Sequence, residues 1–262
     1  MSFDIVIPVG PNDLSIIYST IRYTKANIID YRNIYIISKH EIKINGCIYV
    51  SEDQFPIQIE TVKEMGDFCD RAGWYYQQII KLYAGRCIPE LLENYVVLDS
   101  DVYILKPLSF MNNGVPLFAT GIEHHPPYFE HMNRLHPSLN KQLNASGICH
   151  HMVFTKTYLE ELFKLVEDYS SNQTLCPKDN TCCSVENGER TTVLRPFWKI
   201  FLEELSHPIP ETGASEYEIY FNFMVHYHYP NMHIRNLYWM DCGSLSDAQP
   251  HHDYIAVHHW RR

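Results

Sequence analysis

Two aspartates separated by one residue, Asp99 and Asp101, lie between the apolar runs 95–98 and 102–105. A short, continuous apolar run is typical of a strand that is buried on both faces of a sheet. In an extended segment, residues i and i+2 point to the same side, so two carboxylates would face one spot and repel unless a cation lies between them. Carboxylate oxygens suit Mg²⁺ or Mn²⁺. We therefore predict a divalent-metal site; the alternative is a solvated turn with the aspartates as turn formers.

Two adjacent histidines, His258 and His259, follow the apolar run 254–257 near the end of the chain. Imidazole is a common ligand for Mn²⁺ beside carboxylates. Neighbours on a strand point to opposite sides, so we expect one of the two to reach the metal, and His258 is preferred. The alternative is a His-rich terminal tail.

A helix over 74–82 precedes the two aspartates. Its polar side chains recur at spacings of three and four residues and so share one face with a tryptophan: Trp74, Gln77, Gln78 and Lys81. Amide and ammonium groups on that face suit hydroxyls and phosphate. The alternative is a tryptophan that packs in the core, with the polar side chains at its rim.

Ser215 opens another predicted helix, which continues to about Tyr229. Ser215 and Glu218 have the capping-box spacing, so one interpretation of Glu218 is that it only caps the helix. Glu216 lies in the first turn, where the helix dipole favours a carboxylate. The other interpretation is that this carboxylate points into a cleft.

The N-terminal part has the pattern of an open α/β sheet flanked by helices, within one domain of 262 residues. Buried strands are predicted over 4–10, 33–38 and 47–50, with a helix after the first strand that is capped by Asn12 or Asp13 and buries Leu14, Ile17 and Ile21. In such sheets, ligands bind beyond the carboxyl ends of the strands. Pro8, Val9 and Gly10 would lie there, as would Asp99.

The remaining elements follow from the same patterns. We expect a strand over 115–120, a loop and short helix over 124–136 that lines a sugar subsite, a polar turn at 144–147 that enters a strand, helices over 156–169 and 196–205, and a surface insertion over 170–192. The insertion contains Cys176, Cys182 and Cys183, which lack the paired spacing of a zinc site.

The composition excludes several classes of protein. Apolar residues make up 45% of the chain, enough for a sizeable core, and the net charge of −10 comes without a basic cluster, which argues against a nucleic-acid partner. No signal peptide and no apolar run of the ~20 residues that a membrane helix needs is evident. We therefore expect a cytoplasmic protein whose eight cysteines are reduced thiols.

With these motifs, the chain resembles the GT-A-type nucleotide-sugar glycosyltransferases over nearly its whole length. It is most similar to a group of such enzymes that share three stretches, which here are Trp74–Gln78, Asp99–Asp101 and Ser215–Glu218. The resemblance implies a Rossmann-like sheet in which a metal bridges the Asp-x-Asp motif and a nucleoside diphosphate sugar, with a C-terminal His as a further ligand. It implies a nucleotide-binding part at 1–106 and an acceptor-binding part at 107–262.

The site residues that the resemblance implies fall into three sets. A UDP- or GDP-linked sugar donor would contact Pro8, Val9, Gly10, Arg71, Gln77, Gln78, Lys81, Asp99, Ser100 and Asp101. Mn²⁺ or Mg²⁺ would bind Asp99, Asp101 and His258 or His259. A glycan, protein or small-molecule acceptor would contact Asn144, Ser146, His151 and Glu216.

Glycosyl transfer with inversion needs a general base for the acceptor hydroxyl. Glu216 is the first candidate and Glu218 the second; a retaining enzyme needs neither. Two other functions compete with a glycosyltransferase. One is a catalytically inactive GT-A-like binding module, and the other is a phosphohydrolase using Asp99 and Asp101, for which a second carboxylate cluster is not evident.

Overall fold

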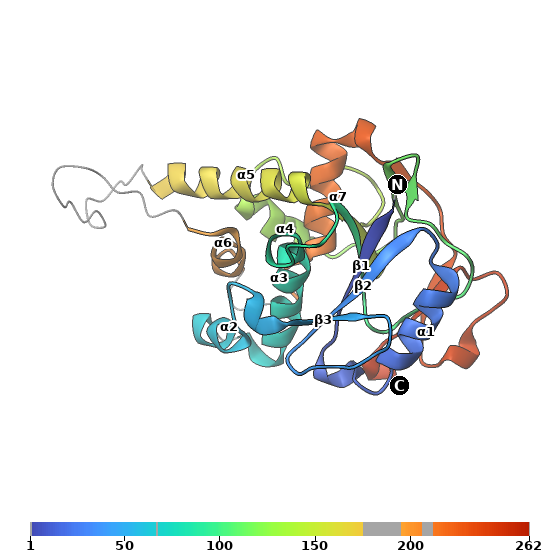
Figure 1. Ribbon diagram of the computed structural model, residues 1–262. Helices are drawn as coiled ribbons and strands as arrows, with labels where there is room; N and C mark the ends of the chain where they lie inside the picture. The colour runs from blue at the N-terminus through green and yellow to red at the C-terminus, as the bar shows by residue number, and fades with distance from the viewer. Residues whose placement is uncertain (1, 67, 175–194, 206–211, 262) are drawn as a thin grey trace.

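A five-stranded sheet forms the centre of the molecule (Figure 1). The computed structural model describes residues 2–66, 68–174, 195–205 and 212–261. The strand order is β3-β2-β1-β4-β8, with β1 (Phe3–Pro8), β2 (Tyr31–Ser38), β3 (Ile48–Ser51), β4 (Asn94–Leu98) and β8 (His151–Thr155). The first four strands are parallel, and β8 is antiparallel to β4. The carboxyl ends of β1 and β4 therefore meet at one edge.

The described residues also form two three-stranded sheets. One has the order β10-β11-β5, with β10 (Trp239–Cys242), β11 (Tyr254–Val257) and β5 (Val102–Ile104), and the other the order β6-β7-β9, with β6 (Met111–Asn112), β7 (Val115–Phe118) and β9 (His233–Ile234). β11 is antiparallel to β5, which begins directly after Asp101. This pairing brings the end of the chain beside the two aspartates, and the amide of Val257 donates to the carbonyl of Asp101 at 2.9 Å.

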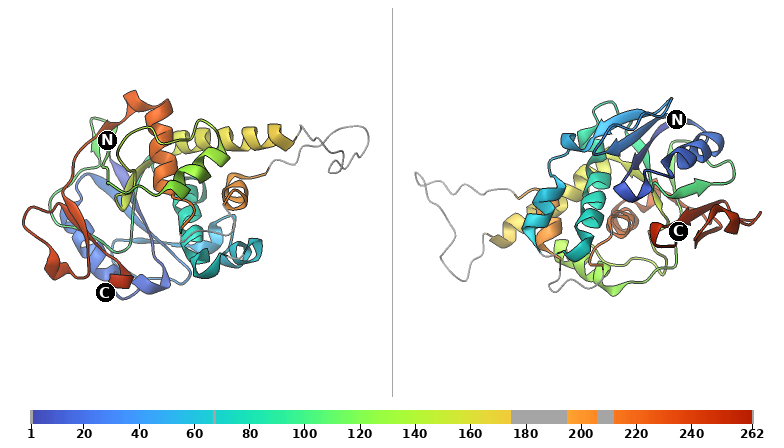
Figure 2. Two further views of the ribbon diagram at one scale, coloured as in Figure 1. Left: turned by 180° about the vertical axis from the view of Figure 1, so that it is seen from behind. Right: turned by 90° about the horizontal axis from the view of Figure 1, so that it is seen from below.

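Helices cover both faces of the central sheet (Figures 1 and 2). They are α1 (Ile17–Asn27), α2 (Ile59–Met65), α3 (Ala72–Cys87), α4 (Pro126–Leu135), α5 (Lys156–Thr174), α6 (Phe197–Glu203) and α7 (Glu216–Tyr227). Side chains alternate between the faces along each strand, as the strand period requires. In β1, Val6 packs into the large core under α3, α5 and α7, whereas Ile5 and Ile7 pack into a second core with α1 and β11.

The α/β class predicted from the sequence is confirmed. Ile17 and Ile21 are buried on α1 as expected, but the prediction for Leu14 was wrong, since its side chain is 48% exposed. The reason is that Pro11–Asp13 form a short 3-10 turn, so α1 begins only at Ile17.

The Asp-Ser-Asp segment is a turn, which corrects the expectation that Asp99 and Asp101 extend a single strand. The amide of Val102 donates to the carbonyl of Asp99 at 3.2 Å, and the chain leaves the central sheet for the sheet of β5. The argument from residues i and i+2 on one side of a strand therefore does not apply here. The carboxylates have different partners, as described below.

The predicted insertion over 170–192 also begins differently. Residues 170–174 belong to α5, which extends the predicted helix of 156–169 by more than a turn. Residues 175–192, with the three clustered cysteines, lie outside the described part of the chain. Within the described part, none of the helices has the length and apolar character that crossing a membrane requires.

Candidate metal centre

The turn at Ser100 is held in place by the 3-10 turn Pro11–Asp13 and by α1. The Ser100 hydroxyl donates to Asp13 Oδ2 at 2.6 Å, and the Thr20 hydroxyl donates to the carbonyl of Ser100 at 2.6 Å. Both Ser100 and Thr20 are buried. The aspartates on either side of Ser100 are thus presented by a fixed backbone.

Asp99 belongs to a buried set of charges that we call the lysine network, formed by Lys81, Asp99, Glu216 and Tyr217. Lys81 Nζ lies 2.6 Å from Asp99 Oδ1 and 2.6 Å from Glu216 Oε1. The Tyr217 hydroxyl donates to the same Asp99 oxygen at 2.8 Å. One ammonium group therefore links α3 to the end of β4 and to the start of α7.

The pKa values of the lysine network follow from burial and from these contacts. Burial by itself lowers the pKa of Lys81, but Asp99 and Glu216 outweigh burial and leave this pKa above its usual range. Burial raises the pKa of Asp99, yet Lys81 and His150 overcome it and lower this pKa. For Glu216 burial prevails over Lys81 and raises the pKa.

A second set of side chains, which we call the histidine centre, consists of His150, Asp241 and His258. Nε2 of His150 lies 2.9 Å from Asp241 Oδ1, and Nε2 of His258 lies 3.2 Å from the same oxygen. The three residues each offer one ligand atom, and these atoms lie within 4.8 Å of one another. Both histidines are buried. Two imidazoles and one carboxylate can hold a divalent cation on one side and leave other positions open.

The carboxylates determine the protonation of the histidine centre when no metal is bound. Burial lowers the pKa of His150, but Asp241 and Asp99 outweigh it and raise this pKa to about 9. For His258, Asp101 and Asp241 overcome burial and likewise raise the pKa to about 9. Burial raises the pKa of Asp241, but both histidines bring it below its usual range. Metal binding therefore has to displace protons from both rings.

The backbone at His150 separates it from its neighbour. His150 has φ +63°, which is uncommon for a residue with a side chain. Its imidazole reaches the histidine centre, whereas His151, the first residue of β8, packs between Phe110 and Tyr254 in the core. A backbone conformation of this kind costs about 1–3 kcal/mol of folding free energy, which contacts with the surrounding structure must offset. Such residues cluster at functional sites.

Aromatic rings form the walls beside the histidine centre. The Trp239 ring packs edge-on against His150 with centroids 5.0 Å apart, and it stacks on Tyr254. Trp260 stacks on His258 at 4.3 Å and is 64% exposed. The two imidazoles are thus restrained on their ring faces and edges as well as by carboxylates.

Of the four predicted metal ligands, the structure brings Asp99, Asp101 and His258 together, and the His259 side chain lies outside what is described. The sequence analysis missed His150 and Asp241. The adjacent histidines at 150 and 151 repeat the pattern of the pair at 258 and 259, but the sequence does not show which of them reaches the site. Asp241 stands alone between Met240 and Cys242 and has no comparable signal.

The predicted nucleotide-binding residues divide between the sheet edge and the helical core. At the end of β1, Pro8 and Val9 are buried and Gly10 is partly exposed. The ammonium group of Lys81 already contacts two carboxylates, so its contact with a phosphate stays a prediction. Gln78 is also buried, and its Oε1 accepts from the amide of Glu216.

Two further residues of that set lie near the start of α3. Arg71 is exposed, in the short turn just before the helix, and Gln77 is half-buried on it. Ser100, also in that set, donates its hydroxyl to Asp13 and so helps to hold the turn; its contact with a donor stays a prediction.

The predicted base and acceptor residues are largely engaged in internal bonds. Glu216 contacts Lys81, while the fully buried Glu218 accepts from the Ser146 hydroxyl at 2.6 Å and from the Asn222 amide at 2.9 Å. Glu218 therefore does not complete a capping box, although its backbone amide donates to Ser215 Oγ. In this structure Ser146 and the two glutamates are held by these internal bonds. That Glu216 or Glu218 acts as a base, and that Ser146 and Glu216 contact an acceptor, stay predictions.

Two acceptor residues remain. His151 lies in the core and is 1% exposed, so its side chain is not presented to solvent, and its contact with an acceptor stays a prediction. Asn144 is exposed. The polar turn at 144–147 also has a structural reason for its glycine. A Cβ atom at Gly147 would lie 2.7 Å from the carbonyl oxygen of Tyr217, so glycine allows α7 to pack closely against the turn.

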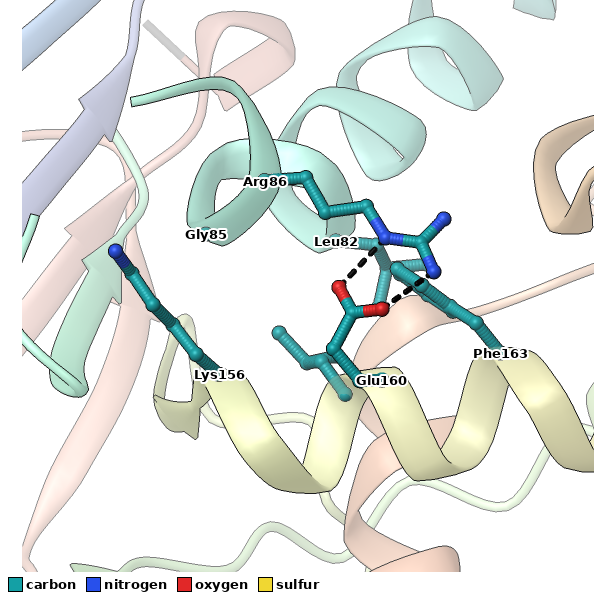
Figure 3. Close-up of a pocket in the computed structure, with 7 residues that line it drawn as sticks. Leu82, Gly85, Arg86, Lys156, Glu160 and Phe163 are labelled. Carbon is teal, nitrogen blue, oxygen red and sulfur yellow. Dashed lines mark hydrogen bonds and ion pairs between the residues drawn. The ribbon is translucent and has the colours of Figure 1, made fainter. Parts of the chain in front are cut away.

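A hollow between α3 and α5 does not resemble a binding site (Figure 3). Its lining residues are Leu82, Gly85, Arg86, Lys156, Leu159, Glu160 and Phe163. Arg86 and Glu160 form two hydrogen bonds of 2.6 Å across it, and both side chains are partly exposed. This hollow is a surface seam between two helices.

Comparison with known proteins identifies a family. Residues 12–258 match a family of unknown function, DUF6492. The chain belongs to this family. The matched region includes the Asp-Ser-Asp turn and all three residues of the histidine centre. No curated protein matches the chain.

Proposed function

We propose that this member of the DUF6492 family is a metal-dependent glycosyltransferase that moves a sugar from a nucleoside diphosphate sugar to an acceptor hydroxyl. The observation that carries the proposal is the position of the histidine centre. The strand order changes direction between β1 and β4, and the Asp-Ser-Asp turn follows the carboxyl end of β4. In open α/β sheets, ligands bind in the crevice at such a switch point.

The arrangement of the parallel strands supports a nucleotide as that ligand. The order β3-β2-β1-β4 matches the first four positions of the 3-2-1-4-5-6 order of a doubly wound, dinucleotide-binding sheet. Gly10 follows β1 at the same edge, and a Cβ atom there would have no other atom within 4 Å. A GT-A-like Rossmann sheet is the arrangement that we infer from this order together with the sequence motifs.

The residues of the histidine centre suit a divalent cation. A cation bound there would neutralise the negative charge that develops on a departing diphosphate. Imidazole nitrogens favour Mn²⁺ and later transition metals over Mg²⁺, which prefers oxygen. Of the two metals expected from the sequence, we therefore propose Mn²⁺.

The internal bonds of Glu216 and Glu218 bear on the stereochemistry. Neither carboxylate is available to remove a proton from an acceptor hydroxyl, because Lys81 holds one and Ser146 with Asn222 holds the other. This supports a reaction with retention of configuration, which does not need that base. The same observation favours the second candidate function, a GT-A-like module that binds a nucleotide without catalysis.

A thermal-unfolding screen tests the proposal. The full chain is heated with Mn²⁺ and, separately, with UDP, GDP, ADP or CDP, each with and without the metal. We expect at least one nucleoside diphosphate to raise the melting temperature only when Mn²⁺ is present. No shift with any of them would contradict the proposal. The Asp30→Asn variant is a matched control, because Asp30 is exposed before β2, at the opposite edge of the sheet.

The two candidate functions then separate by turnover. A transferase releases nucleoside diphosphate from the matching donor sugar, and His258→Gln should abolish this release. Binding without release, over a range of sugars and acceptors, would identify the binding module.

A further inference from the structure

The two histidines of the histidine centre are oriented in the same manner. Nδ1 of His150 lies 3.5 Å from Asp99 Oδ2, and Nδ1 of His258 lies 3.0 Å from Asp101 Oδ2. Both Nε2 atoms face one oxygen, Oδ1 of Asp241. Each ring therefore has one nitrogen against the Asp-Ser-Asp turn and the other against Asp241.

Asp99 has little capacity left for a cation. Its Oδ1 contacts Lys81 Nζ and accepts from the Tyr217 hydroxyl, and its Oδ2 faces His150. The ammonium group already compensates the charge of this carboxylate at 2.6 Å. A metal bound directly to Asp99 would have to compete with that buried ion pair.

One carboxylate oxygen of Asp101 is also engaged. Its Oδ2 lies 3.0 Å from Nδ1 of His258, and this contact is buried. Its backbone carbonyl accepts from the amide of Val257, the residue that precedes His258. Asp101 thus fixes both the strand that carries His258 and the direction of the imidazole.

The spacing around Asp241 fits coordination. Two ligand atoms that each lie ~2.1 Å from a cation, at right angles to one another, are ~3.0 Å apart. The two Nε2 atoms lie 2.9 and 3.2 Å from Asp241 Oδ1. Although it is that close, Nε2 of His150 has no hydrogen-bond partner among the described residues. Nε2 of His258, by contrast, forms a hydrogen bond with this oxygen at 3.2 Å. A short nitrogen–oxygen distance without a hydrogen bond, as at His150, is expected of two ligands of one cation.

We propose that a divalent transition metal binds directly to Nε2 of His150, Oδ1 of Asp241 and Nε2 of His258, and that Asp99 and Asp101 only position the two imidazoles. Carboxylates commonly hold the other ring nitrogen of a metal-bound histidine in this way. Three protein ligands leave the remaining positions to water or to an oxygen of a substrate. The inference shares its metal with the proposed function but requires neither a nucleotide nor sugar transfer.

The test uses the metal-free full chain and Mn²⁺ alone. Affinity is measured by calorimetry, and the number of water molecules bound to Mn²⁺ is measured by pulsed EPR in ¹⁷O-labelled water. Asp241→Ala should weaken binding more than ~100-fold and, at saturating Mn²⁺, add one bound water. Asp101→Ala should weaken binding only ~10–100-fold, the range for positioning residues, and leave the number of waters unchanged.

Two further measurements sharpen the result. The native protein should show coupling of Mn²⁺ to two imidazole nitrogens, and His150→Gln and His258→Gln should each remove one. Asp101→Glu should recover part of the affinity lost in Asp101→Ala. Since Asp99 also belongs to the lysine network, its variant is the milder Asp99→Asn, with folding checked by circular dichroism; Asp30→Asn is the control.

The opposite pattern would overturn the inference. If Asp101→Ala adds a bound water and Asp241→Ala leaves affinity and hydration as in the native protein, Asp101 is the ligand. If the native protein binds neither Mn²⁺ nor Co²⁺ nor Zn²⁺, the histidine centre is not a metal site. If the protein passes these tests but binds no nucleoside diphosphate, the inference about the metal ligands stands and the proposed function is wrong.

Discussion

The lysine network and the histidine centre lie side by side, joined by Asp99, yet they differ in how their charges are satisfied. In the lysine network, Lys81 Nζ lies 2.6 Å from both Asp99 and Glu216, and its side chain and that of Glu216 are 6% and 4% exposed. In the histidine centre, the nitrogen–oxygen distances are 2.9 and 3.2 Å, and the Asp241 side chain is 34% exposed.

This difference distinguishes a cluster that stabilises the fold from one that can bind a ligand. A buried ammonium group between two carboxylates is complete without any ligand, and removing one partner leaves charge without compensation. Two imidazoles that converge on one partly exposed carboxylate retain the capacity to bind a cation. The sequence motif that includes Asp99 is therefore shared between the two, with one carboxylate oxygen facing each.

The largest effect is expected when the lysine network is broken. Lys81→Met leaves Asp99 and Glu216 buried without their common cation, so the free energy of unfolding in urea should fall by ~3–5 kcal/mol. Adding Glu216→Gln to this variant removes one of the two charges and should recover part of the loss. A loss below ~1 kcal/mol in the single variant would mean that water already compensates these carboxylates.

The histidine centre should stabilise the protein only through its ligand. Mn²⁺ at a hundred times its dissociation constant should add ~2.7 kcal/mol to the free energy of unfolding, since the unfolded chain lacks the site. His258→Gln should remove this gain while the metal-free variant stays folded. Equal stabilisation of the native protein and the variant by Mn²⁺ would place the metal elsewhere.

The free energy of unfolding of the metal-free protein should depend on pH through two kinds of buried histidine, those with a raised pKa and those with a lowered pKa. His150 and His258 have a pKa of about 9, above the ~6.5 of an unfolded histidine, so the folded state binds more protons between these values. Stability should therefore be highest below pH ~6.5 on this limb and fall as the pH rises to 9, by up to ~1.4 kcal/mol per pH unit for each ring. Saturating Mn²⁺ should abolish this alkaline decline, because the metal-bound rings are neutral.

Below pH ~6.5, stability changes with pH in the opposite direction. Burial lowers the pKa of His131 and His151 to about 3, so the unfolded state binds more protons between that value and ~6.5. Stability should fall as the pH drops through this range, with a slope that decreases when His131→Gln is introduced. Denaturant titrations at half-unit pH steps measure both limbs; a flat profile from pH 5 to pH 9 would contradict the assignment.

The smallest effect is expected for the exposed ion pair between α3 and α5. Arg86 and Glu160 have two contacts of 2.6 Å, as short as those of Lys81, but their side chains are 35% and 50% exposed (Figure 3). Glu160→Gln should change the free energy of unfolding by at most ~1 kcal/mol, and less at high salt. A loss equal to that of Lys81→Met would show that burial is not what distinguishes the two pairs.

The sequence by itself determined the features that depend on neighbours along the chain. Apolar runs and turn residues predicted the strands and helices of an α/β fold, because backbone period and local sterics are set within a few residues. Residue type and position also identified Asp99, Asp101 and His258 as candidates for one site, although the assumed geometry of the aspartates was wrong.

Only the tertiary structure decided which partner each of these residues has. Lys81 and Glu216 are 135 residues apart in the sequence, and Asp101 and His258 are 157 apart. The sequence pattern treats Lys81 and Glu216 as separate polar residues, each suited to a substrate, but packing α3 against α7 makes them an ion pair. His150 and Asp241 became recognisable only when β8 and β10 were placed beside the turn, because contacts between distant segments depend on how sheets and helices pack, which local patterns do not encode.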